Sequence, residues 1–424
     1  MSKWSKKKIK DFAFTASGGT PSTERKEYWH NGTIPWINSG ELSKHDIIKK
    51  PTTYITQEAL DNSSAKLFPI GTVVIALTGA TTGMSAILEI ETSTNQSITG
   101  IFPSKEHDSK FLLYTLHHNI DKILLHNVGS AQPHINKEIV DNLEFNYPIV
   151  PEQYVISKIL STADAVIEKT QAAIAKYKAI KQGMLQDLFT RGIDLNTNKL
   201  RPRYQDAPEL YKEGKLGWIP REWEDKSIES IGEIVTGSTP PTARAEYYGD
   251  AFLFVSPADI QDNFFIQETG KKLTQSGFDV TRKLPVNSIC VVCIGSTIGK
   301  MALLAKEGCT NQQINSVICH DPELSFYFFY AMMFYNEPQF RRETGLQAVP
   351  IVNKSQFSEF LLPVAEKTEA LKIAERLKAI DNKLQTEQTY LQKIQSLKKG
   401  LMEDLLSGRK QVKVAEEVLT LSEN

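Results

Sequence analysis

Two stretches of the chain place their core positions at alternating steps of four and three residues. Such steps are the a and d positions of a heptad repeat, and they predict a long helix with a seam that packs against another helix. The first seam is Ile156, Leu160, Ala163, Ile167, Thr170, Ile174, Tyr177, Lys181, Met184 and Leu188. The second seam is Ile373, Leu377, Ile380, Leu384, Glu387, Leu391, Ile394, Lys398, Leu401 and Leu405.

The two seams match position by position at a constant offset (373 − 156 = 217). Each carries two polar positions, Thr170 and Lys181 in the first and Glu387 and Lys398 in the second. Polar seam residues fix register and partner at a cost in stability. We therefore predict that the two helices pair with each other as an antiparallel coiled coil, which gives the molecule an approximate two-fold axis. The alternative is that each helix packs only on its own globular domain.

The segments in front of the two helices also repeat each other. The matching features are Gly18, Thr20 and Pro21 with Gly237, Thr239 and Pro240; Gly79 to Gly83 with Gly295 to Gly299; Asn95 and Gln96 with Asn311 and Gln312; Gly129 with Gly345; and Asn136 and Lys137 with Asn353 and Lys354. A duplicated unit explains these matches. Short strand patterns, Gly/Thr/Pro turns and brief apolar helices predict the α+β class for both segments.

The repeat predicts a fold of two similar globular domains separated by two long α-helices. The expected boundaries are a first domain over 1–150, a helix over 151–192, a linker over 193–216, a second domain over 217–363, a helix over 364–408 and a tail over 409–424. The linker is assigned because 193–216 is rich in Pro, Asn, Lys and Arg and lacks apolar periodicity.

Composition narrows the class of protein. The chain has 424 residues, of which 41% are hydrophobic and 23% charged, and it contains no apolar run near the ~18 residues of a membrane span. No apolar signal-peptide core follows the basic first residues, so we expect a cytoplasmic protein. The formal net charge of −1 argues against a strongly basic nucleic-acid binder, although local basic contacts are what DNA requires.

Catalytic and cofactor motifs are missing from the sequence. Gly295 to Lys300 has three residues between its glycines where a phosphate loop has four, and Met301 stands where a hydroxyl would hold magnesium. Cys290 and Cys293 have the spacing of half a zinc site, but strand residues three apart point to opposite faces, which favours core packing. We therefore expect no catalytic residue, metal or cofactor in this chain.

The chain nevertheless resembles a known family, the specificity (S) subunits of type I restriction-modification systems, over about residues 1 to 412. The resemblance is carried by Ser17 to Ser22, Tyr28 and Trp29, Ile34 to Ile37, Phe68 to Ile75, Gly79 to Gly83, Asn95 and Gln96, Pro151 to Gln153, and Gly217 to Trp223. Each string is short, but their duplicated order together with two matched heptad helices is specific.

This resemblance implies two target-recognition domains, each reading one half of a bipartite, asymmetric site in double-stranded DNA. It implies that the helices set the half-site spacing and dock two modification subunits, which methylate adenine, and that restriction subunits join the full complex. S-adenosylmethionine, ATP and magnesium would then belong to the partners. The alternatives are a coiled-coil scaffold or adaptor without a DNA-reading role, and an enzyme with an unrecognised active site.

Candidate DNA contacts are polar and basic side chains in the repeated loops, because these groups match the donors and acceptors of the major groove. In the first domain they are Thr20, Ser22, Arg25, Lys26, Asn38, Ser39, Thr81, Thr82, Asn95, Gln96 and Gln132. In the second they are Thr239, Thr242, Arg244, Ser256, Ser296, Thr297, Lys300, Asn311, Gln312 and Gln347. For each of them a turn or cap role is the alternative. The apolar seam residues are the candidates for the coiled-coil and partner interface.

Overall fold

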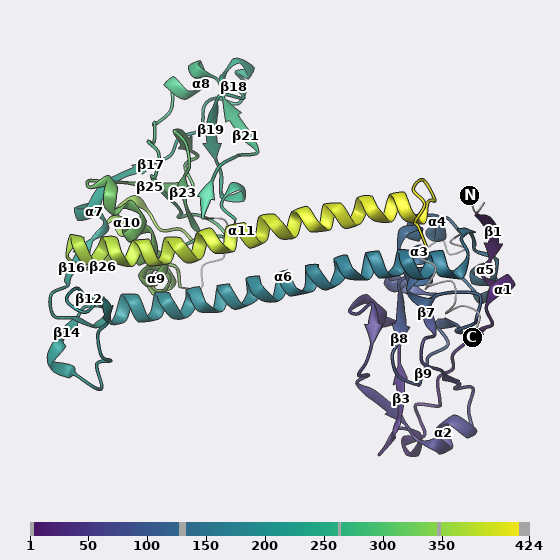
Figure 1. Ribbon diagram of the computed structural model, residues 1–424. Coiled ribbons are helices and arrows are strands. Elements are labelled where there is room, and N and C mark those ends of the chain that lie inside the picture. The colour runs from purple at the N-terminus through teal and green to yellow at the C-terminus, as the bar shows by residue number, and fades with distance from the viewer. Residues whose placement is uncertain (1–3, 127–132, 262–263, 346–348, 415–424) are drawn as a thin grey trace. The chain divides into compact units, whose positions relative to one another are not determined.

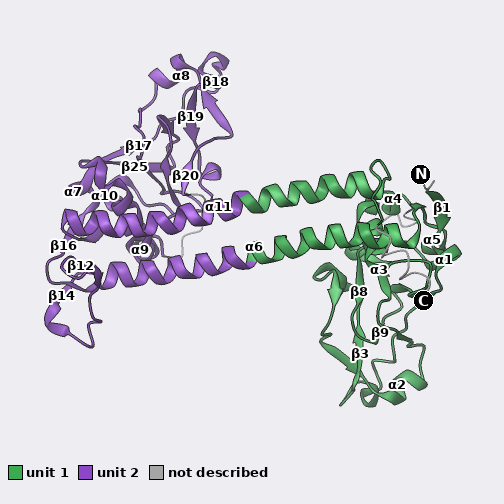
Figure 2. Ribbon diagram, in the orientation of Figure 1, with its two compact units in different colours: residues 1–171, 390–424 green, residues 172–389 purple. Residues whose placement is uncertain are grey.

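The computed structural model describes residues 4–126, 133–261, 264–345 and 349–414. The chain divides into two compact units, and the division crosses both long helices (Figure 2). Unit 1 comprises residues 1–171 and 390–424, and unit 2 comprises residues 172–389. Each unit therefore contains one globular domain, half of the first long helix and half of the second.

Two small sheets form the globular domain of unit 1. The five-stranded sheet has the order β2 (Thr15–Ser17), β10 (Ile98–Ile101), β7 (Val73–Ala76), β8 (Ser85–Leu88) and β4 (Ile47–Ile48). The four-stranded sheet has the order β5 (Thr53–Ile55), β3 (Ile34–Ile37), β9 (Thr92–Thr94) and β6 (Leu67–Phe68). Every residue of β7 is buried, as expected for an apolar strand covered on both faces. A separate pair joins β1 (Ser5–Lys8) to β11 (Glu144–Tyr147).

Unit 2 repeats this topology in its five-stranded sheet and, with differences at both sheet edges, in its second sheet. Its five-stranded sheet has the order β17 (Gly232–Thr236), β25 (Ile314–Cys319), β22 (Ile289–Val292), β23 (Met301–Leu304) and β20 (Phe265–Ile266). Its second sheet has the order β18 (Tyr248–Gly249), β21 (Lys271–Leu273), β19 (Phe252–Val255) and β24 (Gly308–Thr310). The pair β16 (Glu224–Ser227) and β26 (Leu361–Val364) corresponds to β1 and β11. The internal duplication predicted from the sequence is thus confirmed.

The other helices belong to the globular domains of the two units. Unit 1 contains α1 (Ile9–Phe12), α2 (Gln57–Asp61), α3 (Ser109–His118), α4 (Ile120–Leu124) and α5 (Lys137–Asn142). Unit 2 contains α7 (Ile228–Ile231), α8 (Gln275–Asp279), α9 (Ser325–Thr344) and α10 (Lys354–Ser358). The 3-10 helices are η1 (Lys26–Tyr28), η2 (Ser39–Ser43), η3 (Gly79–Thr81), η4 (Pro208–Leu210), η5 (Ala245–Tyr247), η6 (Pro257–Asp259) and η7 (Pro322–Leu324).

The long helices are α6 (Val150–Thr190) and α11 (Lys367–Leu406) (Figure 1). Every predicted seam position of both helices is buried or half-buried. In unit 1 the beginning of α6 shares a core with the end of α11, where Ile156 and Leu160 join Leu405 and Leu406. In unit 2 the end of α6 shares a core with the beginning of α11. Antiparallel pairing within an α+β fold is confirmed, and the pair also packs on the globular domains.

Both long helices end at a glycine with a positive φ. Gly192 has a φ of 66° and Gly408 a φ of 76°, and each stands two residues beyond the last helical residue. This left-handed conformation at the C′ position is the common way to end a helix, and glycine adopts it without a steric penalty. The helices therefore end at Thr190 and Leu406, two residues before the limits expected from the sequence.

The segment predicted to be a linker is folded. It contributes β12 (Ile193–Asp194) paired with β13 (Lys199–Leu200), and β14 (Tyr211–Gly214) paired with β15 (Gly217–Pro220). Its first part contacts Glu369 of α11, which accepts hydrogen bonds from the backbone N–H of Ile193 and the guanidinium of Arg201. The prediction relied on apolar periodicity within the segment. Contacts with Glu369, which is distant along the chain, produce no such periodicity.

The four cysteines lie in the interior of unit 2 as free thiols. Cys290 packs in one hydrophobic cluster with Leu253 and Leu304, whereas Cys293 packs in another with Tyr327 and Phe329. The two side chains therefore point to opposite faces of the sheet, as their strand spacing predicts. Within the described residues, no three His, Cys, Asp or Glu side chains are grouped as metal ligands would be.

Candidate nucleic-acid interface

A polar pair stands at the same edge of each unit. In unit 1 the hydroxyl of Thr20 donates a hydrogen bond to Oε1 of Gln96, and in unit 2 the hydroxyl of Thr239 donates to Oε1 of Gln312 at 2.6 Å. In both pairs the glutamine is exposed. Because its oxygen is held by the threonine, the amide N–H₂ of each glutamine stays available to an external acceptor.

Glycine allows the two loops of this edge to approach each other. A Cβ atom on Gly237 would lie 2.2 Å from the carbonyl oxygen of Asn311, and one on Gly18 would lie 2.4 Å from the carbonyl oxygen of Thr94. Any larger residue would force the loop away from the neighbouring strand. The repeated Gly-x-Thr-Pro motif thus places the threonine beside the glutamine in both units.

An arginine stacked on a tyrosine is the second repeated feature. Arg25 donates to the hydroxyl of Tyr28 at 2.6 Å, and its Cζ atom lies 5.2 Å from the centre of that ring. Arg244 donates to the hydroxyl of Tyr247 at 2.9 Å, and its Cζ atom lies 5.5 Å from the ring. Both arginines are exposed. A guanidinium oriented by a ring retains further N–H donors, which suit a phosphate or the edge of guanine.

Unit 2 has a cavity beside its polar pair. This cavity, of about 420 Å³, is lined by Thr239, Ser256, Asn311, Asp259 and Lys271, among others. Ser256 is only partly available to a ligand, because its hydroxyl already donates a hydrogen bond to Asp259 at 2.6 Å. The structure thus brings together three of the predicted contacts of the second domain.

Two lysines beside this cavity were missed by the sequence reasoning. Lys271 lines the cavity, and Lys272 lines a neighbouring hollow together with Thr242 and Glu268. Lys272 forms an ion pair with Glu268, and this hydrogen bond raises the pKa of Lys272. Lys271 and Lys272 fall outside the repeated motifs, and no sequence signal marked them.

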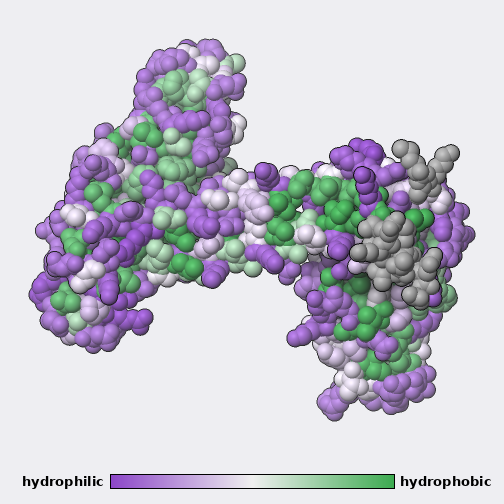
Figure 3. Space-filling model, in the orientation of Figure 1, coloured by the Kyte–Doolittle hydropathy of each residue, from purple (hydrophilic) through white to green (hydrophobic). Residues whose placement is uncertain are grey.

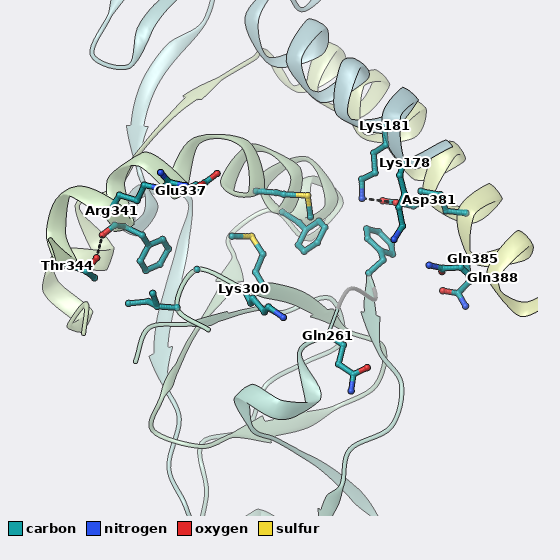
Figure 4. Close-up of a pocket in the computed structure, with 18 residues that line it drawn as sticks. Lys178, Lys181, Gln261, Lys300, Glu337, Arg341, Thr344, Asp381, Gln385 and Gln388 are labelled. Carbon is teal, nitrogen blue, oxygen red and sulfur yellow. Dashed lines mark hydrogen bonds and ion pairs between the residues drawn. The ribbon is translucent and has the colours of Figure 1, made fainter. Parts of the chain in front are cut away.

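Lys300 does not line the cavity beside the Thr239–Gln312 pair. It lines a cavity of about 640 Å³ between α9, the turn after β22 and the long helices, which Lys178 and Gln261 also line (Figure 4). Its counterpart in unit 1 is Met84, which is exposed but uncharged. The two units therefore differ in charge at this turn, and Lys300 is not grouped with Thr239 and Asn311.

The remaining predicted contacts differ in exposure. Those exposed are Ser22, Lys26, Asn38, Thr242 and Ser296, and those half-buried are Ser39, Thr81, Asn95 and Thr297. Asn38 also caps η2 by accepting from the N–H of Gly40, and Asn311 bonds to Gln313. Gln132 and Gln347 lie outside the described residues.

Thr82 is buried, unlike the other predicted contacts among the described residues. Its side chain is only 5% exposed, and its hydroxyl donates to the carbonyl oxygens of Gly79 and Pro133 at 2.7 and 2.8 Å. These bonds hold the turn after β7 against the segment before α5. Thr82 therefore has a structural role in this turn.

Comparison with known proteins identifies the family. Residues 1–177 and 220–396 match the family model described as "Type I restriction modification DNA specificity domain". The two matched regions coincide with the two halves of the internal repeat and together cover most of the chain. The chain belongs to this family.

Individual family members support this assignment. The specificity subunit of the type I restriction enzyme MjaIX from Methanocaldococcus jannaschii is 31% identical over 281 residues, which are 63% of this chain and 62% of that protein. The specificity subunit of HindI from Haemophilus influenzae is 32% identical over 154 residues, or 35% of this chain and 33% of that protein. The chain thus aligns with less than two thirds of the length of either relative.

Solved structures share the fold. The S subunit of a type I restriction-modification system from M. genitalium superposes with a TM-score of 0.63 and 14% identity, over 96% of both chains. A chain from a study of complex assembly and conformational transition in the type I R-M system gives a TM-score of 0.52 and 13% identity, over 96% of this chain and 98% of that one. At these identities the likeness concerns the fold of the specificity-domain family alone.

The long helices of this family member expose apolar residues outside the seam. Ile180 is 39% exposed and Leu397 is 55% exposed, and they are equivalent positions of the repeat (397 − 180 = 217). Tyr154 and Leu371 form a second exposed pair with the same offset. The predicted seam residues face the helix pair and the cores, whereas these four side chains are exposed. Their repetition off the seam is the sequence signal that could have found them.

No described helix combines the length and the apolar character that a membrane crossing requires.

Proposed function

We propose that this chain is the subunit that gives a type I restriction-modification complex its DNA sequence specificity. In this proposal each globular domain reads one half of a bipartite, asymmetric site in duplex DNA. The observation that carries it is the repeated set of one Thr–Gln pair and one Arg–Tyr pair in each family-matched domain, in which the glutamine and the arginine are exposed. Such a set supplies donors for both phosphates and base edges, once per half-site.

Differences between the two domains support an asymmetric site. Unit 2 adds Lys271 and Lys272 near its polar pair, and it carries Lys300 where unit 1 carries Met84. In the view of Figure 3, hydrophilic residues surround a smaller group of hydrophobic ones at the end of unit 2 that bears α8 and β18. Two scaffolds of one topology with different surface donors are suited to different base sequences.

The proposal assigns chemistry to partner subunits. Two modification subunits would methylate adenine with S-adenosylmethionine, and restriction subunits would cleave with ATP and magnesium, in the cytoplasm where the host DNA lies. The chain itself would be non-catalytic. Because the exposed helix positions Ile180 and Leu397 are equivalent, each unit offers the same apolar contact, which suits two copies of one partner.

The test is to co-express the chain with the modification subunit of its own system and to map methylated adenines in the host DNA by sequencing. We expect a split, asymmetric motif that disappears when this chain is omitted. Exchange of residues 1–150 for those of another family member should change one half of the motif only. Methylation that is unchanged without the chain would contradict the proposal and leave a coiled-coil scaffold as the better description.

A further inference from the structure

One buried carboxylate connects three helices of unit 2. Asp381 of α11 is 7% exposed; its Oδ2 atom accepts a hydrogen bond from the hydroxyl of Tyr330 of α9 at 2.7 Å, and its Oδ1 atom lies 2.7 Å from Nζ of Lys181 of α6. The same Nζ lies 5.5 Å from the centre of the Tyr330 ring. Figure 4 shows this ion pair at the side of the cavity that the long helices line.

Unit 1 contains the same cluster with the roles of the long helices exchanged. Asp164 of α6 accepts from the hydroxyl of Tyr114 of α3 at 2.6 Å and lies 2.5 Å from Nζ of Lys398 of α11. The ammonium lies 5.4 Å from the ring of Tyr114. The two lysines are the charged seam positions noted in the sequence, whereas the two aspartates stand one residue after a seam position.

Both clusters define one antiparallel register. Along α6, Lys181 follows Asp164 by 17 residues (181 − 164), and along α11, Lys398 follows Asp381 by the same number (398 − 381). A single alignment of the two helices therefore satisfies both ion pairs. Burial raises the pKa of both tyrosines, which remain neutral donors to the carboxylates.

The apolar seam alone does not choose this alignment. Leucine and isoleucine recur at heptad spacing in both helices, so a shift of one heptad remakes apolar contacts. The same shift would place Asp381 opposite Ile174 or Leu188, and Asp164 opposite Leu391 or Leu405. It would leave four charges without partners, of which Asp381 is 7% exposed and Asp164 is 37% exposed. The loss of a partner is strongly unfavourable for the buried carboxylate, although a well-packed apolar substitute for such a pair is often tolerated.

We propose that the two Lys–Asp–Tyr clusters select the register of the helical pair and seat each globular domain on it, and so confine the complex to one distance between half-sites. The second part rests on the proposed function. A heptad shift moves one helix by about 10 Å along the other, which corresponds to about three base pairs of DNA.

Two variants, one with neutralised charges and one with exchanged charges, distinguish an effect on the register of the helices from an effect on stability. The neutral variant carries Lys181→Met, Asp381→Asn, Lys398→Met and Asp164→Asn, which keep an acceptor for each tyrosine and an apolar stem in the seam. The exchanged variant swaps lysine and aspartate within each pair, so each ion pair is retained. If the fourfold neutral variant does not fold, neutralising the unit 2 pair alone provides the same comparison.

A third ion pair offers a matched control. Lys367 of α11 lies 2.7 Å from Asp321 and 2.6 Å from Glu323, so it too joins the globular domain of unit 2 to a long helix, but all three side chains are accessible to water. Lys367→Met with Asp321→Asn removes the same types of charge, and it should leave the register unchanged because solvent replaces the lost partner.

Register is measured without DNA by spin labels on the full-length chain. Lys176→Cys on α6 and Thr386→Cys on α11 are both exposed positions of unit 2. Burial raises the pKa of the native thiols to about 12 for Cys290 and Cys293 and to about 11 for Cys309 and Cys319, which directs labelling to the new cysteines.

We expect one label distance in the unmodified, exchanged and control chains, and a second population in the neutral variant. In methylation maps the neutral variant should keep both half-sites and accept a second gap that differs by about three base pairs. A single distance and a single gap in the neutral variant would overturn the proposal. Methylation that never depends on the chain would remove the proposed function and the claim about gaps, while the label distances would still decide the register.

Discussion

Arg201 and Glu369 form a bidentate ion pair inside unit 2. Nη1 lies 2.6 Å from Oε1 and Nη2 lies 3.0 Å from Oε2, and the two side chains are 11% and 2% exposed. The same carboxylate accepts from the indole N–H of Trp223 at 3.1 Å and from the backbone of Ile193. Glu369 therefore joins the segment after α6, the entrance to the second globular domain and the first turn of α11.

Removal of the arginine should destabilise unit 2. Arg201→Met leaves the buried Glu369 carboxylate without its counter-charge, so we expect the free energy of unfolding to fall by about 3–5 kcal/mol. Hydrogen exchange along α11 in chemical denaturant measures the loss. Arg203→Met, at an exposed position two residues away, should change it by less than ~0.5 kcal/mol. Equal effects of the two substitutions would contradict this reading of Glu369.

Arg244 should contribute to binding through one half-site. Its guanidinium is exposed and oriented by Tyr247, so we expect Arg244→Ala to weaken DNA binding by the assembled complex and to reduce the slope of log affinity against log salt by about 0.9. Titration at several salt concentrations gives the slope. Lys226→Met removes a charge paired with Glu224 and serves as the control. An unchanged slope for Arg244→Ala would exclude a phosphate contact by this residue.

Lengthening the helical pair should widen the recognised gap. Because α6 and α11 pair antiparallel, one heptad has to enter both helices, after Gln171 and after Thr389, to keep both ion pairs aligned. The pair then lengthens by about 10.5 Å, and we expect a gap about three base pairs longer with unchanged half-sites. Methylation mapping reads the gap. Retention of the original gap would show that the helices do not set the spacing.

Stability of unit 1 should fall in acid because of one buried histidine. Burial lowers the pKa of His107 to about 4 from its ordinary 6.5, against the smaller opposing effect of Asp108. The unfolded chain then binds a proton between about pH 6.5 and pH 4 that the folded chain does not, so the free energy of unfolding falls as pH falls through this window. The expected loss is about 3 kcal/mol.

Hydrogen exchange of α3 at pH 7 and pH 4.5, corrected for the intrinsic exchange rate, checks this pH dependence. His107→Gln should flatten it, whereas His30→Gln should not, because His30 is exposed. If both variants followed the unmodified chain, the acid sensitivity would have another origin.

The isolated chain should bind DNA weakly. Its formal net charge is −1, so attraction to DNA rests on a limited number of local basic contacts and counterion release is limited. We expect partner subunits to supply most of the phosphate contacts. Equilibrium titration of the purified chain against its mapped site tests this, and nanomolar affinity at physiological salt would contradict it.

Several features could be predicted because their signals are local or repeated. The heptad steps mark both long helices from neighbouring residues, and the second copy of each motif marks the repeat. The same comparison could have found the clusters, since Tyr114, Asp164 and Lys398 recur as Tyr330, Asp381 and Lys181. They were missed because the aspartates lie beside the seam and the tyrosines lie in the globular domains.

The sequence by itself determined the duplication, the two helices and the residue types at the candidate interface, because periodicity and repetition are properties of neighbouring positions. The tertiary structure decided which polar residues are free to contact a ligand and which are bonded inside the protein. In the folded chain, Thr82 bonds within its own turn, and Lys181 and Lys398 form ion pairs with Asp381 and Asp164. Residues 193–216 are folded, and their first residue bonds to Glu369. These outcomes depend on burial and on partners far away in the chain, and both exist only once the chain has folded.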